Sequence, residues 1–174
     1  MARFDDCLAV ILGNEGGVSN NPIDTGGLTN MGITQPVYDD YRAHHGLPLQ
    51  PVTFVTLDEA SAIYLASYWT PARGQSLEQP VDLCMLDMAV NSGVYRAARL
   101  LQQCVGVVQD GILGPKTLAA AAKVDPLKLA ADYCSARVAF VQGIVAANPE
   151  QRIFLNGWIN RINHIRHVCG IAGY

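Results

Sequence analysis

Apolar residues recur at a helical spacing at the start of the chain. These residues are Phe4, Cys7, Leu8, Ile11 and Leu12. Their spacing predicts an amphipathic helix, which Gly13 can end. Residues 14–34 lose this period and are rich in Gly, Asn, Asp, Thr and Pro, which favour turns. We therefore expect a turn-rich loop after the first helix, with a short β-hairpin around residues 25–27.

Helical patterns dominate the chain after residue 35, and several have recognisable start signals. Thr56 and Glu59 have the spacing of a capping box, and Asp125 before Pro126 is a typical N-cap followed by a first-turn proline. We expect helices over 35–46, 57–69, 80–93, 94–105, 126–147 and 158–168. Strand signals are few, so the predicted fold class is mainly α (α+β), with a small β element near the N-terminus.

The composition places the chain among folded globular proteins. Half of the 174 residues are apolar and 16% are charged, whereas disordered chains combine low hydrophobicity with high net charge. The net charge is −3 without clustered Lys and Arg, so we expect no nucleic-acid partner. The longest apolar stretch, 138–147, is about half of the roughly 20 residues that a spanning helix needs, so we expect no membrane insertion. The first residues lack the basic start of an export signal.

Cysteine and histidine positions give little support for metal or thiol chemistry. The five cysteines have no CxxC-type spacing, and we expect small buried thiols in a reduced compartment. A nucleophilic role for Cys7 is the alternative, although no His and acid lie near it in the sequence. His164 and His167 share a helical face without nearby acids or cysteines. We expect neither a metal nor a cofactor.

Glu15, Asp24 and Thr29 form the most informative constellation. Glu15 follows the apolar first helix and is flanked by glycines, so partial burial and a raised pKa are expected for its carboxyl group. Asp24 lies in a polar, Gly-rich segment where a carboxylate stays ionised, and a hairpin would bring it and Thr29 to face Glu15. Glycoside hydrolysis needs such an acid and a second polar group that handles water. The alternative is that Asp24 and Thr29 serve only turns and caps.

Five segments together resemble the glycoside hydrolase family 108 lysozymes, which are N-acetylmuramidases of phages, prophages and bacteria. The segments are EGGVSNNPIDTGGLTNMGIT, SAIYLASYW, LDMAVNSG, LLQQCVGVVQDGILGPKTL and FLNGWINR. The resemblance implies a lysozyme-like fold with a catalytic region over 1–95. It also implies a helical peptidoglycan-binding-like region over 96–174, packed on the first as one compact unit.

The same resemblance implies that Glu15 is the catalytic acid. The Glu-x8-Asp-x4-Thr spacing is similar to that of phage-type lysozymes, which invert the anomeric configuration. Val18 departs from the family pattern, because an aromatic residue is common at this position.

Five further residues are candidate substrate contacts. Asp87 and Asn91 are four residues apart and share a helix face, where they could line a cleft or form a buried polar brace. Tyr64, Tyr68 and Trp69 could stack on sugar rings or belong to the core. In the DGILGPKT segment we expect a structural turn, with glycines for special dihedral angles and Asp and Thr as caps.

The expected activity is hydrolysis of the β-1,4 bond between N-acetylmuramic acid and N-acetylglucosamine. Glu15 would protonate the glycosidic oxygen, and Asp24 with Thr29 would position water. The alternatives are a lytic transglycosylase, a chitin-directed hydrolase or a non-catalytic peptidoglycan-binding protein. A protein made in the cytoplasm would reach the periplasm or cell wall through a phage holin or a secretion system. We favour an endolysin over a secreted effector, which would need an immunity protein as partner.

Overall fold

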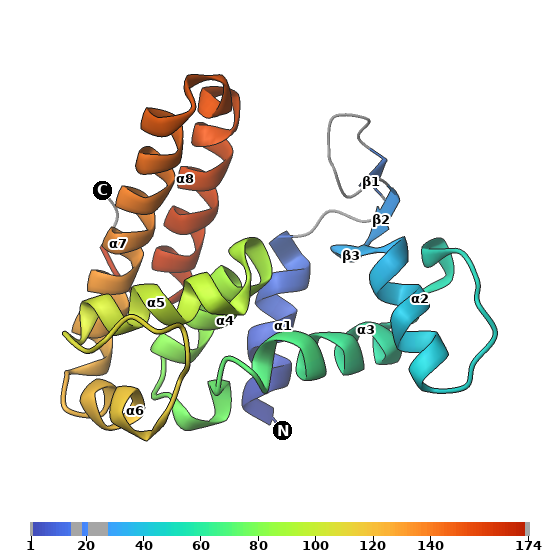
Figure 1. Cartoon of the computed structure of the whole chain (residues 1–174), viewed down its shortest axis with the longest axis horizontal. Helices are drawn as coiled ribbons and strands as arrows, with labels where there is room; N and C mark the ends of the chain where they lie inside the picture. The colour runs from blue at the N-terminus through green and yellow to red at the C-terminus, as the bar shows by residue number, and fades with distance from the viewer. Residues whose placement is uncertain (1, 15–18, 21–27, 173–174) are drawn as a thin grey trace. The chain divides into compact units, whose positions relative to one another are not determined.

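The computed structural model describes residues 2–14, 19–20 and 28–172 (Figure 1). Contacts divide the chain into two compact units, 1–67 and 68–174. Helices dominate both units, and a small antiparallel sheet follows the first helix. The predicted class, mainly α with a small β element near the N-terminus, is confirmed.

The first unit begins with a helix and a three-stranded sheet. The elements are α1 (Ala2–Asn14), β1 (Ser19–Asn20), β2 (Leu28–Asn30) and β3 (Ile33–Thr34). The strands are antiparallel in the order β1-β2-β3, with Thr29 opposite both Ser19 and Thr34. Met31 and Gly32 join β2 to β3 with φ of 51° and 71°. Two positive φ values in a two-residue loop match the twist of a hairpin. The third strand was not expected from the sequence.

Two helices complete this unit, α2 (Gln35–His44) and α3 (Leu57–Tyr64). The predicted capping box is present, because the Thr56 hydroxyl accepts from the Glu59 amide (3.2 Å) and Glu59 accepts from the Thr56 amide (3.0 Å). Glu59 also accepts from Arg42 (2.6 Å) and from the Tyr38 hydroxyl (2.7 Å) on α2. One carboxylate therefore caps α3 and ties it to α2.

A π-helical turn, Leu65–Trp69, continues α3 where the sequence predicted an uninterrupted α-helix. A π turn takes one more residue per hydrogen-bonded ring than an α turn, so it shifts which side chains face inward. Trp69 is buried and lies against Gly74, whose missing Cβ leaves room for the indole ring. Tyr68 is half-buried.

The second unit is built from five helices among its described residues. They are α4 (Val81–Ser92), α5 (Val94–Cys104), α6 (Pro115–Ala121), α7 (Pro126–Ala147) and α8 (Arg152–Val168). The predicted N-cap is confirmed, since Asp125 accepts from the Lys128 amide at 2.8 Å. Helix α8 begins six residues before the predicted start at Trp158, after a 3₁₀ turn over Pro149–Gln151. Residues 81–89 of α4 are all buried, so this helix forms the centre of the unit.

The buried side chain of Gln102 organises the connection from α5 to α6. Its amide group donates to Asp110 (2.6 Å), to the Ile112 carbonyl (3.0 Å) and to Thr117 (3.3 Å), and its oxygen accepts from the Gly111 amide (2.9 Å). Gly111 has a φ of 77°, as expected for this turn. The expected caps differ: Asp110 accepts within the loop and Thr117 lies buried inside α6.

Candidate active site

The described residues lie on both sides of the predicted catalytic acid in the sequence but do not include it. Helix α1 ends at Asn14, and its inner face is anchored by the buried side chains of Phe4, Leu8 and Ile11. Glu15 is the next residue in the sequence, and Asp24 falls between β1 and β2. Both lie outside the described residues, so their roles stay predictions. Cys7, the alternative nucleophile, is also buried in this face of α1, with 1% of its surface exposed.

Thr29 is the member of the predicted catalytic group that the structure describes. It is half-buried at the centre of the sheet, where β2 pairs with both neighbouring strands. The next residue, Asn30, is buried and donates to the carbonyls of Val52 (3.4 Å) and Thr53 (3.2 Å). These bonds fix β2 to a 3₁₀ turn over Val52–Phe54, so Thr29 is carried by a held strand rather than by a loose loop.

The three aromatic candidates occupy different environments. Tyr64 is buried and its hydroxyl donates to the Met31 carbonyl at 2.9 Å, which fastens α3 to the turn between β2 and β3. Trp69 is buried in the second unit. Both placements correspond to the core alternative, because a ring that stacks on a sugar needs an exposed face. Tyr68 is half-buried and keeps accessible surface for a substrate contact.

Asp87 lies in the core of the second unit rather than in a cleft. Its carboxylate is fully buried and accepts from Arg137 of α7 and from Arg161 of α8, the latter at 2.9 Å. A sugar contact would need exposed carboxylate oxygens, so the placement of Asp87 speaks against the expected substrate role. Asp87 joins α4 to α7 and α8, and it does not form the buried pair with Asn91 that was the alternative. Asn91, one turn further along α4, is exposed and keeps the surface that a substrate contact needs.

The charges around Asp87 compensate one another. Arg137 is almost fully buried, and burial alone would lower the pKa of its guanidinium. The carboxylate of Asp87 outweighs this effect and holds the pKa of Arg137 above its ordinary value. The neighbouring Tyr133 is buried with its hydroxyl donating to the Ala97 carbonyl at 3.0 Å, and burial raises the pKa of that hydroxyl well above its ordinary value. The guanidinium of Arg137 is therefore compensated by the carboxylate beside it, and the Tyr133 hydroxyl serves as a hydrogen-bond donor in the core.

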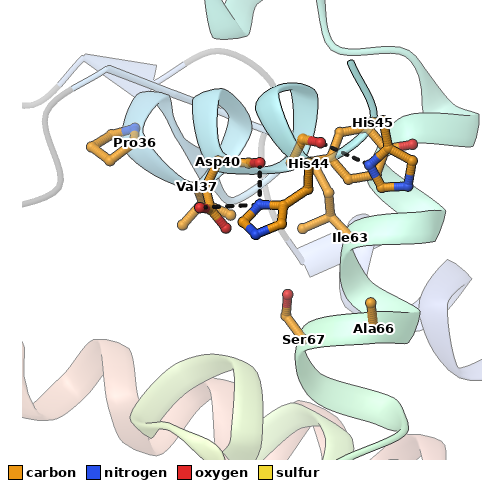
Figure 2. A pocket seen from close by; sticks show the side chains of 9 residues that line it. Pro36, Val37, Asp40, His44, His45, Ile63, Ala66 and Ser67 are labelled. Atoms are coloured by element: carbon orange, nitrogen blue, oxygen red, sulfur yellow. Dashed lines mark hydrogen bonds and ion pairs between the residues drawn. The ribbon is translucent and has the colours of Figure 1, made fainter. Parts of the chain in front are cut away.

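The sequence did not indicate a pocket of about 510 Å³ in the first unit, which Figure 2 shows. One side of α2 contributes Asp40, Tyr41 and His44, and Ile63 and Ser67 lie across from it. The sequence signal that could have indicated this pocket is Asp40, which lies four residues before His44 in the adjacent pair His44 and His45 at a helix end.

Polar groups at the rim of this pocket are held by their own helix. His44 Nδ1 lies 2.8 Å from the Asp40 carbonyl and 3.3 Å from its carboxylate, and both side chains are exposed. His45 Nδ1 lies 2.7 Å from the Tyr41 carbonyl. Asp40 is the one carboxylate among the lining residues, whereas the usual glycosidase centre uses a pair. The pocket suits a small polar group against an apolar wall and supplies no acid pair.

No metal site is found in the part of the chain that the structure describes. There, no three side chains of His, Cys, Asp or Glu come together in a group that could hold an ion. His164 and His167 are exposed on α8. Among the helices described, none has the length and apolar character that crossing a bilayer requires.

Two family models match consecutive parts of the chain. The model described as Glycosyl hydrolase 108 matches residues 8–93, and the one described as Predicted Peptidoglycan domain matches residues 96–163. A solved structure titled "Structure of Brucella abortus SagA" is 35% identical, with a TM-score of 0.83 over 97% of this chain and 94% of that chain. No curated protein matches the chain. The likeness confirms the fold that was expected from the sequence.

Proposed function

The chain belongs to the glycosyl hydrolase 108 family, and from this premise we propose that it is an N-acetylmuramidase. The family makes it a glycoside hydrolase, and the peptidoglycan domain beside it makes peptidoglycan the substrate and the cell wall the place of action. The observation that carries the proposal is this pairing of a glycosidase region with a peptidoglycan domain in one chain. The bond we propose is the β-1,4 bond between N-acetylmuramic acid and N-acetylglucosamine.

We assign the reaction to Glu15, Asp24 and Thr29. Glu15 donates a proton to the glycosidic oxygen, and Asp24 with Thr29 positions water on the opposite face of the sugar, which inverts the anomeric centre. Two features of the described residues support the assignment. An anchored apolar helix leads directly to Glu15, and a sheet strand fixed through Asn30 carries Thr29. Apolar surroundings favour the protonated form of an acid.

The remaining candidates divide according to exposure. Asn91 and Tyr68 are the proposed contacts with the sugar polymer, because both keep accessible surface. Asp87, Tyr64 and Trp69 support the structure through buried contacts. We propose 1–95 as the catalytic region and 96–174 as the region that binds peptidoglycan, and the matches of the two family models over 8–93 and 96–163 support this division.

Phage lysis is the setting we propose for this activity. An endolysin would pass from the cytoplasm to the wall through a holin. The alternative is a secreted antibacterial effector, which would need a specific immunity protein in the producing cell. Both settings use the same bond cleavage, so the chemical test does not depend on the choice between them.

Mass spectrometry of fragments released from purified sacculi tests the proposal. The full chain should release fragments that end in reducing N-acetylmuramic acid, and the Glu15→Gln variant should lose this release by about 10³-fold or more, because the amide keeps the shape but cannot give a proton. Glu150→Gln is the matched control, since Glu150 is exposed in the turn before α8.

Each other product identifies a different reaction. Anhydro-muramic ends, one water lighter, would replace the hydrolase with a lytic transglycosylase. Release from N-acetylglucosamine polymers alone would indicate a chitin-directed enzyme. Binding to sacculi without any release would leave a peptidoglycan-binding protein and would overturn every catalytic role assigned above.

A further inference from the structure

Three cysteines that lie far apart in the sequence meet in the second unit. The sulfur of Cys84 lies 3.7 Å from that of Cys134 and 3.6 Å from that of Cys169. Cys84 is in the first turns of α4, Cys134 is in the middle of α7, and Cys169 caps the end of α8. We call these three residues the thiol cluster. All three are free thiols.

Exposure differs across the thiol cluster and defines a direction of access. Cys84 and Cys134 are fully buried, whereas Cys169 is half-buried and keeps some accessible surface. A dissolved reagent therefore meets the sulfur of Cys169 first. Thiol exchange requires such access to the attacked or attacking sulfur.

The chain end around Cys169 is held in place by the cap of α8. The Cys169 amide donates to the Ile165 carbonyl (2.9 Å), and the Ile171 amide donates to the Arg166 carbonyl (2.9 Å). Gly170 takes a φ of 68° between them, which completes a Schellman-type helix end. Cys169 thus stays beside Cys84 while remaining at a helix terminus, where a side chain adjusts more easily than inside a packed helix.

The pKa values of the two buried thiols are shifted in opposite directions. Hydrogen bonds to Cys134 and Cys169, together with burial, raise the pKa of Cys84 well above its ordinary value. The hydrogen bond with Cys84 lowers the pKa of Cys134 against the effect of burial, with help from the charges of Arg137 and Arg166. Either of these two sulfurs can donate in the contact that joins them.

We propose that the thiol cluster is an oxidation site at which Cys169 and Cys84 form a disulfide through exchange with a small-molecule disulfide. The oxidant is a disulfide of the general form RSSR. The inference does not rest on the proposed function, because it uses only contacts within residues 68–174.

The exchange proceeds in two balanced steps. The Cys169 sulfur attacks RSSR, forms a mixed disulfide and releases one RSH. Cys84 then attacks the Cys169 sulfur of that mixed disulfide, the second RS⁻ leaves, and this RS⁻ takes up the proton that Cys84 loses. The two protein thiols lose two electrons and two protons in total, and RSSR becomes two RSH. The product links α4 to the end of α8 across 85 residues of sequence.

Glutathione disulfide applied to the reduced full chain tests this sequence of steps. After free thiols are blocked by alkylation under denaturing conditions, intact mass should show a protein that carries three alkyl groups, whereas the reduced protein carries five. Peptide mapping should show one Cys84–Cys169 bridge that dithiothreitol reverses. The bridge should also raise the midpoint of thermal unfolding. Cys104→Ser is the matched control, because burial and the nearby Asp132 carboxylate raise the pKa of the Cys104 thiol to about 11.

Two variants separate the entry thiol from the resolving thiol. Cys84→Ser should stop at a glutathione adduct of about 305 Da on Cys169. Cys169→Ser alters a half-buried position and should slow the loss of the Cys84 thiol by about tenfold or more. The proposal is overturned if the wild type keeps all its thiols, if the bridge joins Cys84 to Cys134 instead, or if the Cys169→Ser variant oxidises as fast as the wild type.

Discussion

Asp87 brings a negative charge into the core of the second unit, where two arginines compensate it. The side chain of Arg137 is 2% exposed and that of Arg161 is 18% exposed, so the two ion pairs differ in their access to water. A buried ion pair contributes little net stability, but removal of one partner leaves an uncompensated charge in a medium that solvates it poorly. The two arginines therefore differ in how far water can compensate for their loss.

Replacement of Arg137 by Met should lower the free energy of unfolding by about 3–5 kcal/mol, because the buried carboxylate of Asp87 loses its inner partner. Arg161→Met should have a smaller effect, since water reaches the outer partner. Urea unfolding at pH 7 measures both. Lys128→Met, which breaks an exposed ion pair with Asp132, serves as the control and should leave the midpoint unchanged. Equal midpoints for wild type and Arg137→Met would contradict the buried-charge argument.

At the scale of elements, Glu59 connects the start of α3 with α2. Burial raises the pKa of its carboxyl group, but hydrogen bonds from the Thr56 backbone and the Tyr38 hydroxyl, with the charge of Arg42, outweigh burial and hold the pKa below the ordinary 4.5. The unfolded chain therefore takes up this proton at a higher pH than the folded protein does. The stabilisation by Glu59 is complete above pH 4.5 and is lost as the pH falls through the lower, folded value.

The Glu59→Gln variant should accordingly be less stable than the wild type at pH 7, and the two should converge as the pH falls below 4.5 and through the lower pKa of the folded protein. Far-UV circular dichroism during urea unfolding at several pH values measures this difference. Asp58→Asn removes a charge from the exposed neighbour and is the control. A difference between wild type and Glu59→Gln that stays constant across this pH range would exclude ionisation of Glu59 as its cause.

The elements that could be predicted from the sequence are those with local signals. The capping box at Thr56 and the N-cap at Asp125 place helix starts from short segments, and the structure confirms both. The π turn over Leu65–Trp69 has no such signal, because it depends on which aromatic side chain the core accepts. The third strand likewise depends on Met31 adopting a positive φ.

Candidate site residues could be predicted where they belong to a sequence motif. They could not be predicted where their role depends on whether the side chain is buried. The resemblance placed Glu15, Asp24 and Thr29 in one segment, and the family is now shown while their roles stay predictions. The position of Asp87 between two arginines required contacts across 50 and 74 residues, which no local pattern contains. The pocket beside α2 likewise depends on the packing of residues 63–67 opposite that helix.

At the scale of the whole molecule, the net charge is −3, which gives no general attraction to an anionic polymer. We therefore expect recognition of the wall by shape and hydrogen bonds. Binding of the Glu15→Gln variant to sacculi should change less than about twofold between 50 and 200 mM NaCl, because salt screens mainly the attraction of exposed charges.

Sedimentation of the variant with sacculi measures this binding. A cationic peptide assayed in parallel should lose most of its binding over the same range. A steep salt dependence of the variant would instead indicate a basic contact surface that the net charge conceals.

The places of the two tryptophans have an optical consequence. Trp69 is buried against Gly74 and Trp158 is half-buried near Phe154, and both belong to residues 68–174. Their emission therefore reports directly on the second unit. The first unit contains no indole, so tryptophan emission is no direct probe of it. A melting curve recorded by tryptophan emission therefore describes the second unit and not the unit that contains the start of the catalytic segment.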